Sequence, residues 1–175
     1  MRLERVTTQY DSAQDRFRVL GSTPDGETLA LWLTQRLFIR VIRFLLEWLE
    51  EESADSAEVR RPDNPQVKSS LQNFAQQGAS ASMQVTEPVE PQAKTQSFLM
   101  AEVDIRKNDQ HVVLVFKLPE DELAEVPFDA TQLRQWLHII FSQWQVAEWP
   151  LDIWPLWMRQ AEEESEQDSS SASFH

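Results

Sequence analysis

Apolar and polar positions alternate in three short stretches near the start of the chain, and a helical pattern of apolar positions follows them. Alternation of this kind predicts a strand with one buried face. Turn-forming residues over 11–15 and 23–26 separate the stretches, and Thr34 is placed to cap the helix. Residues 1–49 are therefore predicted to form three strands and a helix. The alternating positions are Val6, Thr8 and Tyr10, then Phe17 and Val19, then Leu29, Leu31 and Leu33.

Residues 97–159 show the same order of patterns. Turns over 107–110 and 119–122 separate three alternating stretches, and Asp129 can cap a helix with Gln132 as its capping-box partner. This block therefore also predicts three strands and a helix. Its strand positions are Ala101, Val103 and Ile105, then Val112, Leu114, Phe116 and Leu118, then Ala124, Val126 and Phe128. The helix positions are Leu133, Trp136, Leu137, Ile140, Phe141 and Trp144.

The two blocks share one spacing. Thr34 and Asp129 are 95 residues apart (129 minus 34), and the same offset carries Phe17 onto Val112 and the first helix onto the second without a gap. Repeated units commonly bury together faces that neither can bury alone. We therefore predict an α+β fold of two βββα repeats, which form antiparallel sheet with a helix layer. Chance agreement of two generic amphipathic patterns is the alternative.

Two segments outside the repeats are poor in core-forming residues. Residues 50–96 are rich in Glu, Ser, Gln, Ala and Pro, and we interpret them as a flexible linker. Residues 160–175 are acidic and rich in serine, and are predicted to be a disordered tail. The linker carries a net charge of −4 (4 basic and 8 acidic residues), and the tail −5 (no basic and 5 acidic residues).

One short helix is predicted within the linker, over residues 65–77. Asn64 could cap it, and Pro65 suits the first helical position, while Gly78 could close it. One face of this helix carries Val67, Leu71 and Phe74. Docking of that face on the folded body is favoured, and a partner-binding helix is the alternative.

Composition narrows the classes of function. The formal charge of −13 argues against binding to a nucleic-acid backbone, although residues 1–49 carry +1 (7 basic and 6 acidic residues). The absence of cysteine excludes a disulfide scaffold, a thiolate metal site and a cysteine nucleophile. With 3 glycines and 3 histidines, there is little material for a phosphate-binding loop or a histidine metal cage.

The first helix has more apolar side chains than contact with one sheet face requires. The surplus, which we assign to Ile39, Phe44 and Trp48, would have to meet the other repeat, a second subunit or a membrane surface. Its polar side carries Arg36, Arg40 and Arg43. A solvated face with an Arg43–Glu47 pair is favoured there, and a docking stripe for an acidic partner is the alternative.

Three tryptophans follow the second helix, at Trp149, Trp154 and Trp157, and we call them the tryptophan strip. Pro150 should end the helix, so the following segment is predicted to be extended. Packing of the strip over the protein's own core is favoured. A partner-binding strip is the alternative, because tryptophan is frequent at interface hot spots.

A nucleic-acid site is a second possibility. Arg16, Arg18 and Trp32 would project from the sheet face opposite the helices, and a basic and aromatic sheet face can hold a single strand. The second repeat has His111, Val113 and Pro127 at the corresponding positions, so it offers no such face.

No catalytic arrangement is predicted from the spacing of polar residues. Asp11, Asp15 and the run Glu120–Glu122 fall in turns, where acidic residues are common without a catalytic role. His111 and His138 have no recognisable catalytic companion, and no zinc spacing or phosphate-binding motif is found. We predict no catalytic residue, cofactor, metal or small-molecule ligand.

The leading prediction is a non-enzymatic, homodimeric, cytoplasmic protein that binds other proteins, as an adaptor, assembly factor or regulatory subunit. The N-terminus lacks the apolar stretch of a secretory signal, and arginines interrupt the apolar region over 29–49, so no transmembrane segment is expected. The predicted docking residues are Ile39, Phe44, Trp48 and the tryptophan strip. The alternatives are a single-stranded nucleic-acid-binding protein and a peripheral membrane protein.

Overall fold

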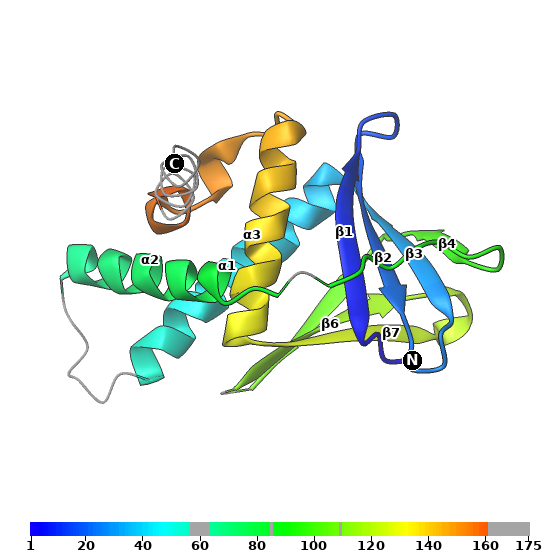
Figure 1. Ribbon diagram of the computed structural model, residues 1–175, viewed down its shortest axis with the longest axis horizontal. Coiled ribbons are helices and arrows are strands. Elements are labelled where there is room, and N and C mark those ends of the chain that lie inside the picture. The colour runs from blue at the N-terminus through cyan, green and yellow to red at the C-terminus, as the bar shows by residue number, and fades with distance from the viewer. Residues whose placement is uncertain (57–63, 85, 109, 161–175) are drawn as a thin grey trace, which may run out of the picture.

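The computed structural model describes residues 1–56, 64–84, 86–108 and 110–160, and it contains the two predicted βββα units (Figure 1). The first unit consists of β1 (Arg5–Asp11), β2 (Arg16–Ser22), β3 (Thr28–Leu33) and α1 (Gln35–Ser56). The second consists of β5 (Val103–Lys107), β6 (His111–Lys117), β7 (Leu123–Asp129) and α3 (Ala130–Val146). Between them lie α2 (Pro65–Ala81) and β4 (Gln96–Leu99), and the 3₁₀ turns are η1 (Pro119–Asp121) and η2 (Leu151–Ile153). The predicted α+β fold is confirmed.

The offset of 95 residues holds for the second hairpin of each unit. Phe17 pairs with Leu33 in the first unit, and Val112 pairs with Phe128 in the second. The first hairpins differ, because their turns are displaced by one residue along the chain. Tyr10 pairs with Phe17, whereas Ile105 pairs with Leu114. A register change of two residues keeps every side chain on its original face. Ala101, however, precedes β5 and is exposed, so the prediction of a buried strand position there is wrong.

The strands form two sheets, and one of them contains a strand that the sequence analysis missed. The first sheet has the order β1-β2-β3-β4 and the second the order β5-β6-β7. The strands of both units pair antiparallel, as predicted, but the additional strand β4 lies parallel to β3, so the first sheet is mixed. With only four residues, two of them apolar, β4 carries too little periodicity to be recognised, and it forms by pairing with β3.

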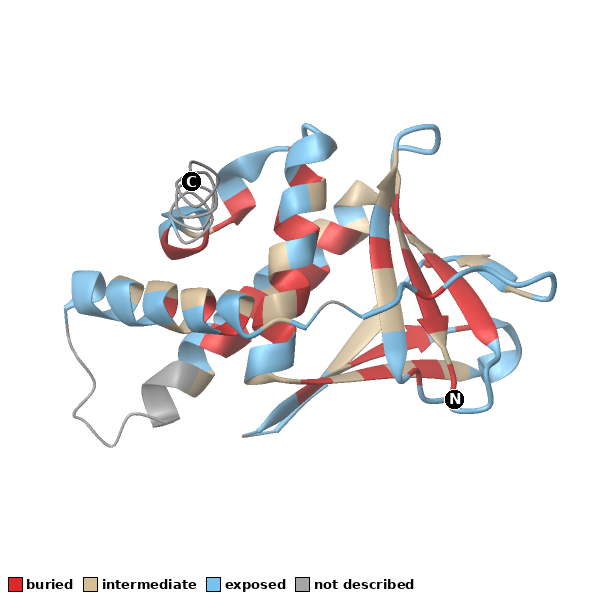
Figure 2. Cartoon of the chain, in the orientation of Figure 1, coloured by how far each residue is buried: buried red, intermediate tan, exposed pale blue. Residues whose placement is uncertain are grey.

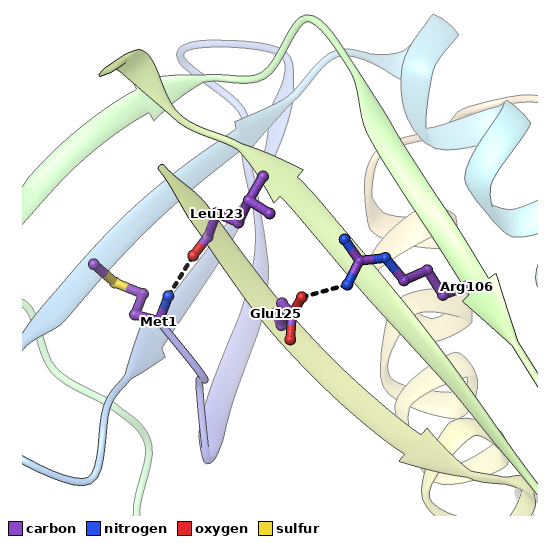
Figure 3. A network of polar contacts seen from close by, with 4 residues as sticks. All are labelled: Met1, Arg106, Leu123 and Glu125. Atoms are coloured by element: carbon purple, nitrogen blue, oxygen red, sulfur yellow. Dashed lines mark hydrogen bonds and ion pairs between the residues drawn. The ribbon is translucent and has the colours of Figure 1, made fainter. Parts of the chain in front are cut away.

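The N-terminal residues join the two sheets. Leu3 N donates to Glu125 O (2.9 Å) and Glu125 N to Met1 O (3.0 Å) on the edge of β7, while Glu4 N already donates to Ser22 O (2.9 Å) on β2. The amino group of Met1 also donates to the carbonyl oxygen of Leu123, beside the Arg106–Glu125 ion pair (Figure 3). The chain therefore passes from one sheet to the other within two residues.

Each helix follows one sheet, but α3 also contacts the sheet of the other unit. Trp136 Nε1 on α3 donates to Thr8 Oγ1 on β1 (2.8 Å), and Tyr10 N donates to Gln143 Oε1 (3.2 Å). Buried apolar side chains from both units consequently form one continuous core, which Figure 2 shows in red. The predicted repeats thus bury their inner faces together.

The helix ends agree with the predicted caps. Asp129 and Gln132 form a complete capping box, Asn64 caps α2, and the Thr34 hydroxyl accepts from Leu37 N (3.4 Å). α1 continues to Ser56, beyond the predicted end of the first repeat at 49. α2 continues past 77 to Ala81, so the prediction that Gly78 closes this helix is wrong. Residues 57–63 of the predicted linker and 161–175 of the predicted tail lie outside the described residues.

The segment after α3 differs from the prediction. α3 ends at Val146, before Pro150, but the next residues form the turn η2 and residues 156–160 are helical, so the predicted extended segment is wrong. Trp144 Nε1 donates to Pro150 O (3.0 Å), which turns the chain back onto α3. Burial of the following tryptophans then favours helical turns over an extended strand.

Candidate interaction surfaces

The tryptophan strip lies inside the chain. Trp149, Trp154 and Trp157 are buried, and Trp149 packs edge-on against Trp144 at 4.9 Å between ring centroids. Trp157 Nε1 donates to Glu50 Oε1 on α1 (3.0 Å). Of the two predicted alternatives, the structure has the one in which the strip covers the protein's own core. A partner-binding role for these residues stays a prediction, and in this structure they are not accessible.

The surplus apolar side chains of α1 are also largely used within the chain. Trp48 is buried, while Ile39 and Phe44 are half-buried. Ile39 packs against the common core, and the Lys107 ammonium of β5 lies 5.6 Å from the centre of the Phe44 ring. Of the three predicted destinations, the structure therefore has the first. Phe44 meets the other repeat through Lys107, and Ile39 and Trp48 join the core that both repeats share.

The basic stripe of α1 faces solvent. Arg36, Arg40 and Arg43 are exposed and make no hydrogen bond or ion pair with any residue that the structure describes, so the predicted Arg43–Glu47 pair is not formed. The structure thus has the favoured solvated face, although without the ion pair, and a docking stripe for an acidic partner stays the untested alternative.

The basic and aromatic face of the first sheet is partly occupied by the chain itself. The Arg18 guanidinium lies 5.7 Å from the centre of the Trp32 ring, and Trp32 Nε1 donates to Ser97 Oγ (2.8 Å). Val89 covers Leu20 and Ala30 on the same face. Arg16 is half-buried at the edge of this face. The area left for stacking of nucleic-acid bases is correspondingly small.

Helix α2 packs against the body with the opposite side from the one expected. Its buried residues are Gln72, Gln76 and Ala79, whereas Val67, Leu71 and Phe74 are 43%, 51% and 76% exposed. We call these three exposed residues the α2 apolar stripe. Figure 2 shows α2 at one end of the molecule, with exposed residues along its length. The prediction that this stripe docks on the body is wrong.

A buried arginine explains the orientation of α2. Arg134 on α3 is buried, and burial lowers its pKa to about 10, so it stays charged at neutral pH. It donates to Gln72 Oε1 and lies 5.5 Å from the centre of the Trp157 ring. Gln76 Nε2 donates to the Arg134 carbonyl oxygen (3.1 Å), and Gln72 Nε2 donates to the Leu49 carbonyl oxygen at 3.2 Å. A buried charge needs polar partners, and the glutamine side of α2 supplies them.

Sequence reasoning did not single out Arg134. It stands next to Leu133 and three residues before Leu137, among the apolar positions of α3, whereas Ile39 occupies the corresponding place in α1. A charged residue within an apolar stripe requires a polar partner when the helix is packed. That signal could have indicated a polar docking site on α3.

A cleft of about 800 Å³ opens between the N-terminal residues, the end of β7, the start of α3 and the segment after α2. Val126, Phe128 and Trp136 supply apolar surface there, and Glu4 and His111 supply polar groups. Among the described residues, no three His, Cys, Asp or Glu side chains are grouped so that they could hold a metal ion. The cleft thus has a mixed lining without a metal-binding cluster in that part of the chain.

Comparison with known proteins gives no relative. No protein-family model, no curated protein and no solved structure matches the chain.

In the described part of the chain, none of the helices combines the length and the apolar character needed to cross a membrane.

Proposed function

We propose that this chain is a non-enzymatic, cytoplasmic protein that binds other proteins, as an adaptor, assembly factor or regulatory subunit, and that the α2 apolar stripe is its docking surface. The carrying observation is that α2 is held in place by its glutamines while Val67, Leu71 and Phe74 face solvent. Single exposed apolar residues are common, but three in line on one packed helix are not.

The geometry of the stripe matches a known mode of recognition. Positions 67, 71 and 74 follow the i, i+4, i+7 spacing with which an amphipathic helix contacts a partner. The stripe lies roughly opposite Gln72 and Gln76, so a partner can cover it without displacing α2. This surface replaces the tryptophan strip as the proposed docking site, because the strip is buried.

The two other functions have less support. The proposed nucleic-acid face has Trp32 bound to Ser97 and is partly covered by Val89. For membrane attachment through α1, a row of apolar residues would have to face outward, and the outer side of α1 carries arginines. Oligonucleotide binding that weakens steeply with salt, or co-sedimentation with liposomes, would restore one of them.

The docking proposal can be tested by site-specific photocrosslinking in the native host. A photoreactive phenylalanine analogue placed at Phe74 should give protein adducts, because Phe74 is the most exposed residue of the stripe. The same analogue at Ser12, in the exposed β1–β2 turn, is the matched control. Absence of adducts at position 74, or equal adducts at both positions, would overturn the proposal.

A further inference from the structure

We propose that the partner of the α2 apolar stripe is the α2 of a second copy of this chain, and that the two helices pair antiparallel. The inference rests on the proposed docking role of the stripe and names its occupant. Alternate steps of four and three residues lead along the whole exposed side of α2, which is the spacing of a coiled-coil seam. All five seam residues are exposed: Val67, Leu71, Phe74, Gly78 and Ala81.

Side-chain size varies along this seam. Its first half carries Val67 and Leu71, its centre Phe74, and its second half Gly78 and Ala81. An antiparallel pair centred on Phe74 places Val67 opposite Ala81, since 67 and 81 sum to twice 74. It places Leu71 beside Gly78, whose numbers sum to 149, so that these two residues are offset by one helical rise of about 1.5 Å. Large side chains then fill the space beside small ones, as close packing requires. A parallel pair would leave Gly78 against Gly78.

Gly78 has no other explanation in the described part of the chain. Glycine is a poor helix former, yet it stands inside α2, where its backbone does not have a positive φ. A Cβ at this position would meet nothing within 4 Å, so no neighbouring group demands its small size. A leucine from a second copy fits the resulting notch.

Charge favours the same arrangement. The chain carries −13, but α2 contains no acidic residue and one basic residue, Lys68. Two copies can therefore approach through α2 without bringing acidic side chains of the helix together. In the antiparallel pair the two Lys68 positions lie about 18 Å apart along the axis, from 12 residues at 1.5 Å each. That separation exceeds the Debye length of about 8 Å, whereas a parallel pair would place them side by side.

The size of the interface indicates a weak dimer. A single pair of helices of this length buries less than the roughly 1,600 Å² of a standard stable interface. We therefore expect association in the micromolar range or weaker, and a measurable monomer population.

Sedimentation equilibrium of the full chain tests the association. The mass should rise with concentration, and Leu71→Ser should weaken dimerisation at least tenfold. Leu99→Ser is the matched control, because Leu99 is exposed to a similar extent (53% against 51%) and lies on β4 at the opposite end of the molecule (Figure 1). Circular dichroism checks that both variants fold. A monomer at every concentration up to about 500 µM, or equal weakening by both variants, would overturn the inference.

Thiol crosslinking tests the orientation, since the chain has no cysteine. With a short bismaleimide, Phe74→Cys should give covalent dimers, and a mixture of Leu71→Cys and Gly78→Cys should crosslink more than either variant alone. Preferential crosslinking of Leu71→Cys with itself would overturn the antiparallel arrangement. If the chain is monomeric but photocrosslinking at Phe74 captures another protein, self-pairing falls and the proposed docking role stands. If neither occurs, both fall.

Discussion

The two βββα units cover the outer faces of their sheets in different ways. In the first unit, Val89 packs on Leu20 and Ala30, and Val89 N donates to Thr7 Oγ1 (2.8 Å). In the second unit, Val115 is buried on the outer face, and the Arg106–Glu125 ion pair (2.7 Å) lies on that face. The outer face of the same three-stranded arrangement can thus be covered by a passing segment or by long side chains of its own strands.

The inner faces differ by an exchange of large and small residues. Gly21 pairs with Leu29 in the first unit, whereas Phe116 pairs with Ala124 at the corresponding positions of the second. The space above Gly21 is filled by Leu3, which is almost fully buried and comes from the segment that also pairs with β7. The first unit therefore depends on the N-terminal residues for packing that the second obtains from its own strand.

The largest expected effect tests this dependence. Leu3→Ala should lower the free energy of unfolding by about 3–5 kcal/mol, because the cavity lies over a glycine that has no side chain to fill it. Urea denaturation measures the change. A loss below about 1 kcal/mol would show that Leu3 does not substitute for the missing side chain of Gly21.

A double-mutant cycle sharpens the result. A Cβ at Gly21 would lie 2.5 Å from Leu3 Cδ1, so Gly21→Ala alone should cost about 1–3 kcal/mol. In the Leu3→Ala background the same change should cost less, since the clashing atoms are gone. Strict additivity of the two changes would contradict the proposed contact.

The next effect concerns the polar contact between the units. Thr8→Val keeps the side-chain shape but leaves the buried indole N–H of Trp136 without its 2.8 Å partner, so we expect a loss of about 1–3 kcal/mol. Thr8→Ser keeps the hydroxyl and is the control. In the second unit Val103 occupies the position that corresponds to Thr8. Val103→Ala should lower the free energy of unfolding, and Val103→Ser should not recover that loss. Equal losses of stability for Thr8→Val and Thr8→Ser would contradict a stabilising role of the hydrogen bond between Thr8 and Trp136.

Local patterns predicted the two units well, because strand alternation and helix caps depend on residues close in sequence. The capping box at Asp129 and Gln132 is an example. The orientation of α2 could not be obtained in this way, since Gln72 is held by Arg134, which lies 62 residues further along the chain. The apolar positions of α2 indicated an inner face, but a buried charge on α3 selected the glutamine side.

The candidate surfaces follow the same division. The apolar content of α1 and of the tryptophan strip was recognisable, but its destination depends on long-range packing. Phe141 and Trp154 meet edge-on at 5.1 Å, and Phe38 and Trp144 meet at 5.9 Å. One chain of this size can use all these rings in its own core, so a surplus counted on one helix does not identify an exposed surface.

A smaller effect compares the two outer faces directly. Val89→Ala should cost about 1–2 kcal/mol, because it uncovers Leu20 and Ala30, whereas Arg106→Gln should cost about 0–1 kcal/mol, because Arg106 is 60% exposed. Urea denaturation at low and high salt separates the two contributions. Added salt should reduce only the effect of Arg106→Gln. A larger loss at Arg106 than at Val89 would reverse the comparison.

The smallest expected effect is a single pKa in the β1–β2 turn, at Asp15, where the residue 95 positions later in the second unit is Gln110. The Asp15 carboxylate accepts from the Tyr10 hydroxyl (2.7 Å) and from Trp149 Nε1 (2.9 Å). These two hydrogen bonds, the one from Tyr10 first, lower the pKa of Asp15. A lowered carboxyl pKa stabilises the fold above the unfolded value of about 3.9, and this contribution is lost as the pH falls through the folded value.

An NMR titration of the Asp15 carboxyl carbon and the Trp149 indole proton measures this pKa. Tyr10→Phe should raise it toward the ordinary value, and by more than Trp149→Phe does, because the tyrosine bond is the larger cause. Asp15→Asn is the control for pH dependence, since asparagine tolerates the positive φ of 48° at this position. A folded pKa at or above about 3.9 would mean that the turn is not fastened to Trp149 through an ionised carboxylate.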